Sequence, residues 1–351
     1  MARSSSGRST TVDAADHLRN GNPDSAFVHL DAVDGAGHDF GGTGRRYRDA
    51  IRTADGQVGR IVAAVKARAT YAGENWLIMV TTDHGHVDEG GHGGNDPNVR
   101  KSFVIANGAG IAAGSKRHDV KIADVAATVL KHTGVAIEPS WGLDGIPIQD
   151  LAPDAFDGLR GSLRTRVDET GTPDPIAADA VGFTRTPSAD WSVDDSAMPS
   201  GGVTEGRGRT FSTGGFWSFS ECYQGRESHV RARDVFAVAD SDEWADAAHW
   251  TGRFDSPLVG PVHQLNGAST ARVTYASHYV ANGPQTGDVY VSFDGGAPRL
   301  LKSYRAADVN QVESLTVNVP AGATTAQLRF RCTGTDSAFW AVDQVSLIPP
   351  S

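Results

Sequence analysis

Cysteine is scarce in this chain, with Cys222 and Cys332 as the only two among 351 residues. Neither belongs to a CxxC pair, so the sequence offers no thiolate site for zinc. In an exported protein the two could form one long-range disulfide, which would close a loop of about 100 residues and add up to about 4.7 kcal/mol on the chain-entropy model. Two buried free thiols are the alternative.

Long apolar runs and an excess of basic charge are also missing. No apolar run approaches the about 20 residues that a membrane-spanning helix needs, and Met1-Ala2-Arg3 leads into Ser and Gly rather than into the apolar core of a signal peptide. The net charge of -10 argues against a nucleic-acid-binding surface. It leaves a small phosphate ester open as the substrate, because bound metal ions supply local positive charge.

The first 24 residues lack an apolar run that could form a core strand, and we expect residues 1–24 to be poorly ordered. The total length predicts two domains, each with its own core. In residues 25–150, apolar strands at 25–33, 76–80 and 102–106 alternate with amphipathic helices at about 47–65 and 122–130, the second capped by Asp119 and ended by Gly134. This order is typical of an α/β fold, here part of a doubly wound parallel sheet.

Carboxylates and imidazoles follow two of these strands. Asp34 and His38 come after the run 25–33, whereas Asp83 and His84 come after the run 76–80, with His92 a few residues further on. The carboxyl ends of parallel strands meet at one edge of an open sheet, so we expect these five side chains to converge there. Carboxylate and imidazole are ligands that zinc accepts, which makes this edge a candidate metal site.

Residues 25–148 resemble the C-terminal half of the catalytic domain of the alkaline phosphatase superfamily, above all its nucleotide pyrophosphatase/phosphodiesterase branch. Asp34 with His38, Asp83-His84-Gly85, His92, the run 120–130 and Leu143-Asp144-Gly145 carry the resemblance. It implies that Asp34, His38 and His92 hold one zinc ion and that Asp83 and His84 are half the ligands of a second. It also implies hydrolysis of a phosphate monoester or diester, with the diester favoured.

The chain departs from that family before residue 25. The family places a metal-binding Asp and then a Ser or Thr nucleophile upstream, and neither has the required strand in front of it here. Asp13 or Asp16 could replace the carboxylate, and the nucleophile could be one of a set of hydroxyl residues: Ser4, Ser5, Ser6, Ser9, Thr10 and Thr11. We otherwise expect an N-terminally truncated enzyme that lacks its nucleophile and binds about one zinc ion instead of two.

Other histidines have weaker functional signals. His86 could replace His92 as a ligand, whereas His29 reads as a core or supporting histidine with Asp31 as its partner. We expect structural roles for His118 and His132.

Residues 151–182 are rich in Asp, Pro, Gly and Ala, which predicts a linker whose least structured point is 172–175. From residue 183 to residue 351 the pattern changes to short strands separated by turn residues, with Asp294-Gly295-Gly296 as one turn. The predicted strands are 271–275, 288–293, 314–319 and 326–330. This pattern predicts a β-sandwich, of jelly-roll type.

The second domain resembles the β-sandwich modules, akin to carbohydrate-binding modules, at the ends of secreted bacterial hydrolases. Residues 236–244 and 339–347 carry this resemblance, which implies secretion and a glycan or cell-surface ligand. The tryptophans could stack on sugar rings, but we expect them to fill the core: Trp191, Trp217, Trp244, Trp250 and Trp340. Asp240, Asp242 and Glu243 could bind calcium, but we expect a solvated turn.

The sequence as a whole therefore predicts a metal-dependent phosphoric ester hydrolase with an appended sandwich. A different function is also open, in which the sandwich binds a glycan or surface and the first domain is an inactive remnant.

Overall fold

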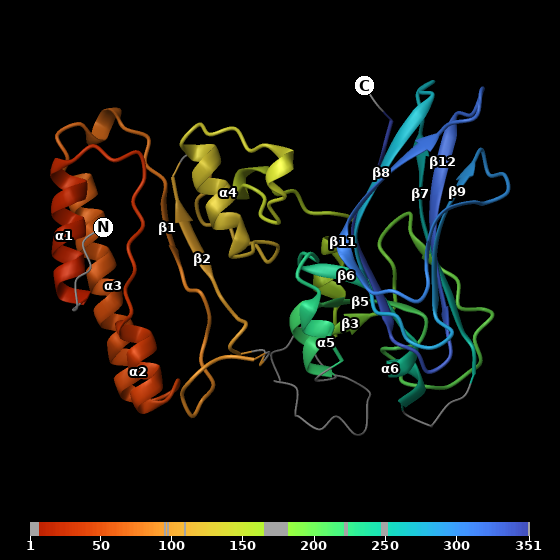
Figure 1. Cartoon of the computed structure of the whole chain (residues 1–351), viewed down its shortest axis with the longest axis horizontal. Coiled ribbons are helices and arrows are strands. Elements are labelled where there is room, and N and C mark those ends of the chain that lie inside the picture. The colour runs from red at the N-terminus through yellow and green to blue at the C-terminus, as the bar shows by residue number, and fades with distance from the viewer. Residues whose placement is uncertain are drawn as a thin grey trace. The chain divides into compact units, whose positions relative to one another are not determined.

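A computed structural model describes residues 7–94, 96, 98–108, 110–164, 182–220, 224–246 and 252–349. The chain divides into two compact units, Met1–Leu151 and Ala152–Ser351. Figure 1 shows helices with a short sheet in the first unit and extended strands in the second. Among the described residues, no helix combines the length and the apolar character that crossing a bilayer would require.

The described residues of the first unit form four helices, two short strands and three 3-10 turns. The elements in chain order are α1 (Gly7–Asn20), α2 (Ala32–Phe40), α3 (Arg45–Lys66), η1 (Tyr71–Gly73), β1 (Ile78–Thr81), β2 (Val104–Asn107), α4 (Ala123–His132), η2 (Pro139–Trp141) and η3 (Ile148–Asp150). Its α/β composition is as the sequence predicted, and its sheet contains two described strands.

Helix α1 occupies the stretch in which the sequence predicted no regular structure. It lies alongside α3 (Figure 1) and buries Leu18 at 5% exposure. The Arg68 guanidinium, beyond the end of α3, donates to the backbone oxygen of Gly21 at 2.8 Å and to that of Leu18. Packing against α3 and the bonds from Arg68 therefore order a polar segment that has no apolar run of its own.

The predicted strand at 25–33 is the main correction to the first unit. Residues 26–31 form no helix or strand, Ala32 begins α2, and Phe27 is 91% exposed. The two strands that do form, β1 and β2, pair antiparallel, with Ile78 opposite Asn107 and Thr81 opposite Val104. A strand needs a hydrogen-bonded neighbour, and the described residues supply none to 26–31, so apolar character alone was not enough.

Helices α3 and α4 form where the apolar periodicity predicted them, but the cap of α4 differs. Asp119 pairs with Arg117 instead of capping the helix. Asp124 accepts hydrogen bonds from the backbone of Lys121 at 2.7 Å and from that of Ile146 at 2.8 Å. Gly134, with a φ of 77°, ends the helix as predicted.

The second unit is a β-sandwich, as the sequence predicted. One sheet has the order β10-β9-β12-β7-β4 and the other β11-β8-β13-β6-β5-β3, with antiparallel pairing throughout the described strands. The strands are β3 (Phe183–Thr184), β4 (Ser192–Val193), β5 (Arg209–Thr213), β6 (Val235–Asp240), β7 (Phe254–Gln264), β8 (Thr270–Tyr279), β9 (Thr286–Phe293), β10 (Arg299–Tyr304), β11 (Val309–Asn318), β12 (Thr325–Gly334) and β13 (Phe339–Ile348). The short helices are η4 (Asp157–Ser162), α5 (Gly214–Ser220), η5 (Arg226–Ser228) and α6 (Ser241–Asp246).

The core of the sandwich lies between the two sheets. Inward side chains from both sheets form one cluster, which Phe156 and Leu159 from the segment expected as a linker also join. Residues 165–181, which include 172–175, lie outside the described residues. Asp294 and Gly295, with φ of 48° and 70°, form the predicted turn between β9 and β10.

Four of the five sandwich tryptophans are interior, as expected. The exposed fractions are 8% for Trp191, 4% for Trp217 and 0% for Trp244 and Trp340, and Trp250 lies outside the described residues. These four side chains are thus core residues, and the glycan ligand of the sandwich stays a prediction.

The acidic stretch after β6 is not a solvated turn. Asp240 and Glu243 are each 3% exposed and both bind the guanidinium of Arg226, whose Nη2 lies 3.0 Å from Asp240 Oδ2. A buried carboxylate needs such a partner, and Arg226 brings it from η5. Asp242 accepts a hydrogen bond from Gln224 at 3.0 Å.

Cys332 on β12 is a buried free thiol, and burial raises its pKa to about 12. Cys222 lies outside the described residues.

Candidate metal centre

Helix α2 presents Asp34 and His38 one turn apart on the same face. Residues four apart on a helix are neighbours, and Asp34 Oδ1 lies 3.6 Å from His38 Nε2. Both side chains are about half exposed, at 44% and 48%. The sequence correctly placed these two residues together, although it placed them after a strand.

Strand β1 ends at Thr81 and leads into Asp83 and His84, as predicted. The Asp83 side chain is 75% exposed, and its Oδ1 accepts a hydrogen bond from the backbone N–H of His84 at 3.1 Å. The His84 side chain is 25% exposed. Asp83 therefore faces solvent, whereas His84 is turned toward the protein.

The loop that carries His86 and His92 is fastened to the end of α2. Gly42 donates its N–H to Asp88 O at 3.1 Å. Gly90 has a φ of 97°, and a Cβ there would lie 2.4 Å from Gly37 O, so only glycine allows this approach. A Cβ on Gly37 would meet the His86 ring at 2.5 Å. The glycines thus let the loop carry its imidazoles onto α2.

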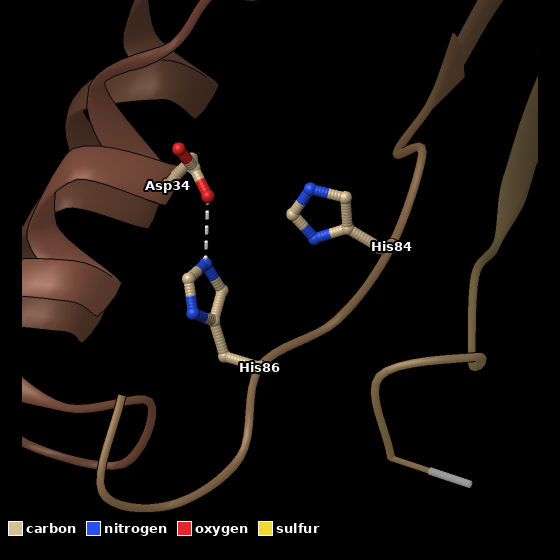
Figure 2. Close-up of side chains that lie close together, drawn as sticks. All are labelled: Asp34, His84 and His86. Atoms are coloured by element: carbon tan, nitrogen blue, oxygen red, sulfur yellow. Dashed lines mark hydrogen bonds and ion pairs between the residues drawn. The ribbon is translucent and has the colours of Figure 1, made fainter. Parts of the chain in front are cut away.

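Asp34 is the point on which the imidazoles converge. Its Oδ1 lies 3.0 Å from His86 Nε2 and 3.4 Å from His92 Nε2, in addition to 3.6 Å from His38 Nε2. The rings of His84 and His92 stack with centroids 3.8 Å apart. Figure 2 shows Asp34, His84 and His86 pointing toward one another.

Two groups of three residues can be distinguished, and both contain Asp34. Within each group, the possible ligand atoms all lie within 4.8 Å of one another. One is Asp34 with His38 and His92, and the other is Asp34 with His84 and His86. Asp83 belongs to neither group among the described residues, although the sequence predicted it as a ligand. The structure therefore brings together four of the five predicted residues and adds His86.

The first group fits a metal ion. Donor atoms bound to one tetrahedral zinc at about 2.0–2.1 Å lie about 3.3 Å apart. The distances from Asp34 Oδ1 to His38 and His92, 3.6 and 3.4 Å, are close to that spacing. One carboxylate and two imidazoles would also leave a coordination position open for a substrate or water.

Tyr47 on α3 borders the centre, with its ring 5.7 Å from that of His86. Burial, and then the negative charge of Asp34, raise the pKa of the Tyr47 phenol. Tyr47 therefore stays neutral at physiological pH and lies beside His86.

The upstream candidates lie apart from both donor groups. Asp13 and Asp16 are on α1 and join neither group. Thr11 is only 1% exposed, and Ser9 and Thr10 are also within α1. Ser4, Ser5 and Ser6 lie outside the described residues. Three other histidines of this unit also lie outside the groups: His29 and His118 are exposed, and the His132 ring contacts Asn75 O at 2.9 Å.

His86 is the residue that sequence reasoning undervalued. Its side chain is 4% exposed, far from the solvated loop position expected for it. In the sequence, His86 is distinguished only by its position two residues after His84 in a glycine-rich stretch. That position does not indicate that its ring packs against Gly37.

The first unit is thus an α/β unit in which Asp and His side chains lie close enough together to hold a metal ion. Residues 3–133 match the family described as type I phosphodiesterase / nucleotide pyrophosphatase. This match confirms, for residues 3–133, the resemblance to the alkaline phosphatase superfamily that the motifs predicted, and it supports a phosphoester transferase-like or hydrolase-like domain there.

Curated relatives of this segment are GPI ethanolamine phosphate transferases 1. The protein from Gibberella zeae is 29% identical over 159 residues, 39% of this chain and 16% of the relative. The protein from Aspergillus fumigatus is 31% identical over 126 residues, 36% of this chain and 11% of the relative. The mouse protein is 35% identical over 85 residues, which are 24% of this chain and 9% of the relative. The chain thus spans less than a fifth of these relatives.

Solved structures with some similarity are β-domains. The module TmCBM61, solved in complex with beta-1,4-galactotriose, has a TM-score of 0.30 and 13% identity over 46% of this chain and 90% of its own. The K1 adhesin domain of Lys-gingipain from Porphyromonas gingivalis has a TM-score of 0.30 and 17% identity. The similarity covers 46% of this chain and 92% of that domain.

Proposed function

We propose that the first unit binds zinc and cleaves a phosphate ester, with a phosphodiester as the substrate. The observation that carries this proposal is the position of Asp34 Oδ1, 3.6 Å from His38 Nε2 and 3.4 Å from His92 Nε2, within the segment that matches the phosphodiesterase family. Carboxylate and imidazole at these spacings are a donor set for Zn²⁺.

Asp34, His38 and His92 would hold the ion. A bound zinc ion polarises the phosphoryl group and lowers the pKa of a coordinated hydroxyl. The Asp34–His38 pair is held on one helix face, and the glycine contacts at 37 and 90 hold the loop before His92 against that helix. These contacts therefore preserve the geometry of the centre.

The acceptor of the phosphoryl group can be water or an alcohol. Curated relatives are named ethanolamine phosphate transferases, so transfer to an alcohol is the alternative to hydrolysis. The same zinc ligands serve both reactions, because the two differ only in the attacking hydroxyl. We propose hydrolysis for this chain and treat transfer as an outcome of the test.

The test is cleavage of bis(p-nitrophenyl) phosphate by the full chain, with and without added zinc. We expect nitrophenolate release that requires the ion, is lost in His38→Ala and is retained in His118→Ala, which removes an exposed histidine. Phosphorus NMR with added ethanolamine separates a transferred product from a hydrolysed one. Release that persists without metal, or that His38→Ala leaves unchanged, would contradict the proposal.

A further inference from the structure

Three imidazoles lie near the Asp34 carboxylate, at two kinds of distance. Asp34 Oδ1 is 3.6 Å from His38 Nε2 and 3.4 Å from His92 Nε2, close to the spacing of about 3.3 Å between two ligands of one tetrahedral zinc ion. His86 Nε2 is closer, at 3.0 Å, and makes a hydrogen bond with the same oxygen. The distances therefore favour ligand roles for His38 and His92 and a hydrogen-bonding role for His86.

The direction of the hydrogen bond between His86 and Asp34 follows from the chemistry of the carboxylate. An ionised carboxylate only accepts hydrogen bonds, so His86 Nε2 carries the hydrogen and donates it. The other ring nitrogen, Nδ1, is buried and has no partner in the part of the chain that is described. Within that part, the hydrogen bond of this ring is thus directed at Asp34 (Figure 2).

The His86 ring lies in a slot formed by two glycines and an aromatic ring. Its side chain is only 4% exposed. A Cβ on Gly37 would meet the ring at 2.5 Å, and a Cβ on Gly42 would lie 3.1 Å from the Cβ of His86. The Tyr47 ring adds an edge contact, with ring centroids 5.7 Å apart. These neighbours therefore set the position from which His86 donates.

One carboxylate oxygen can serve a zinc ion and His86 together. Asp34 Oδ1 has about two lone pairs, so one can accept from His86 while the other binds the ion. The Asp34 side chain is 44% exposed, and packing alone leaves its carboxylate free to rotate. Hydrogen bonds to metal ligands fix such rotations, and losing one typically lowers metal affinity by about 10–100-fold.

We propose that His86 is a positioning residue, which donates to Asp34 and holds its carboxylate in the orientation that binds zinc together with His38 and His92. The inference deepens the proposed function and rests on it for the zinc ion. His86 also belongs to a donor group with Asp34 and His84, so a role as a ligand is the alternative. In that role Nε2 would give up its hydrogen to bind an ion and could no longer donate to Asp34.

The zinc affinity of the full chain tests the proposal without reference to activity. The chain is stripped of metal, and its Kd for Zn²⁺ is measured by competition with a chromogenic chelator. His86→Met fills the slot without a donor, and we expect it to weaken binding by about 10–100-fold. His86→Gln keeps an N–H donor near the position of Nε2 and should bind nearly as tightly as the unchanged chain. The exposed His118 supplies the control, His118→Ala, which should change nothing.

Two further measurements separate positioning from a purely structural role. Thermal unfolding without metal should show His86→Met to be as stable as the unchanged chain, because an apolar side chain still fills the slot. The visible absorption of bound Co²⁺ should shift in His86→Met and stay the same in His86→Gln, because a rotated carboxylate changes the ligand field. His86→Leu replaces His86→Met if circular dichroism shows that the latter is unfolded.

Unchanged zinc affinity in His86→Met would overturn the inference. Equal losses of affinity in His86→Met and His86→Gln, or one ion fewer per chain in both, would also overturn it and would favour the ligand role. Zinc binding that depends on the donor at position 86, in a chain that does not cleave the phosphodiester, would contradict the proposed function alone. Cleavage by a chain whose zinc affinity is indifferent to His86→Met would contradict the positioning role alone.

Discussion

The two units of this chain use their side chains differently. All of the largest fully buried side chains lie in residues 152–351, among them Trp244 and Trp340. In residues 7–151, large apolar side chains such as Phe27, Phe103 and Ile105 are 91%, 51% and 62% exposed. Among the described residues, the second unit thus has the larger core, whereas the first combines a smaller one with close backbone approaches around its candidate metal centre.

Charged groups follow the same division. In the sandwich, buried charges are paired, as Arg226 is with Asp240, or packed on an aromatic ring, as the Arg209 guanidinium is at 4.7 Å from the Trp340 ring centre. In the first unit, the half-exposed Asp34 carboxylate contacts the imidazoles of three histidines: His38, His86 and His92. Charge supports packing in one unit and prepares a binding site in the other, so substitutions should affect metal binding and core stability separately.

Removing the shared carboxylate should have the largest effect. Asp34→Ala takes a ligand from both donor groups, so we expect loss of bound zinc and at least a ~10³-fold loss of phosphodiester cleavage. The unfolding of the sandwich, followed by tryptophan fluorescence, should be unchanged. Full metal content in this variant would contradict the assignment of Asp34, and a destabilised sandwich would contradict the division between the units.

Trp340→Ala should have the reverse effect. Trp340 is 0% exposed, donates to Ser277 Oγ at 3.0 Å and packs against Tyr304 and Phe330. Its truncation should lower the free energy of unfolding of the sandwich by about 3–5 kcal/mol. Urea unfolding measures this loss, and metal analysis should give the same content as the unchanged chain. Equal stability would mean that Trp340 is not a core residue.

Two carboxyl groups of the sandwich, Asp157 and Asp343, should contribute stability that falls as the pH rises. Burial raises the pKa of Asp157 to about 6, and burial followed by the charge of Asp154 raises the pKa of Asp343 well above its usual value. The folded state therefore binds these protons more tightly than the unfolded state. The resulting stabilisation is fully present below the ordinary Asp pKa, and it is lost as the pH rises through the folded pKa values.

Asp343→Asn should reduce that pH dependence. The amide cannot ionise, and its oxygen can still accept the Arg233 N–H that Asp343 Oδ2 accepts at 2.6 Å. We expect the free energy of unfolding, measured by urea titration, to change less between pH 5 and pH 8 in the variant than in the unchanged chain, by at most about 1.4 kcal/mol per unit of pKa shift. The control is Asp336→Asn, at an exposed position. Identical pH dependence in Asp343→Asn and the unchanged chain would be evidence against a raised pKa.

Phe27→Ser should have the smallest effect. With 91% of Phe27 exposed, its loss should change the stability of the first unit by no more than about 0.5 kcal/mol. Thermal unfolding followed by circular dichroism, with zinc absent, measures the change. A loss of several kcal/mol would show that Phe27 is covered and that the sequence was right to place it in a core.

Periodicity predicted much of the fold, because it depends on which faces of an element are apolar. Four strands of the sandwich (β8, β9, β11 and β12), helices α3 and α4 and the turn at Asp294-Gly295 are local patterns of this kind. The pattern failed at 25–33, where apolar character was present but no described strand pairs with it. It also failed at α1, whose order depends on the distant Arg68 and on α3.

For the candidate metal centre, the amino-acid sequence by itself determined the residue types and the resemblance to the phosphodiesterase family, because Asp34 and His38 are four residues apart and His84 follows a strand. Only the tertiary structure decided which donors meet. It turned Asp83 toward solvent and packed His86 against Gly37, within 3.0 Å of Asp34. Such distances depend on how a loop is fastened to a helix many residues away, and no local pattern in the sequence encodes that contact.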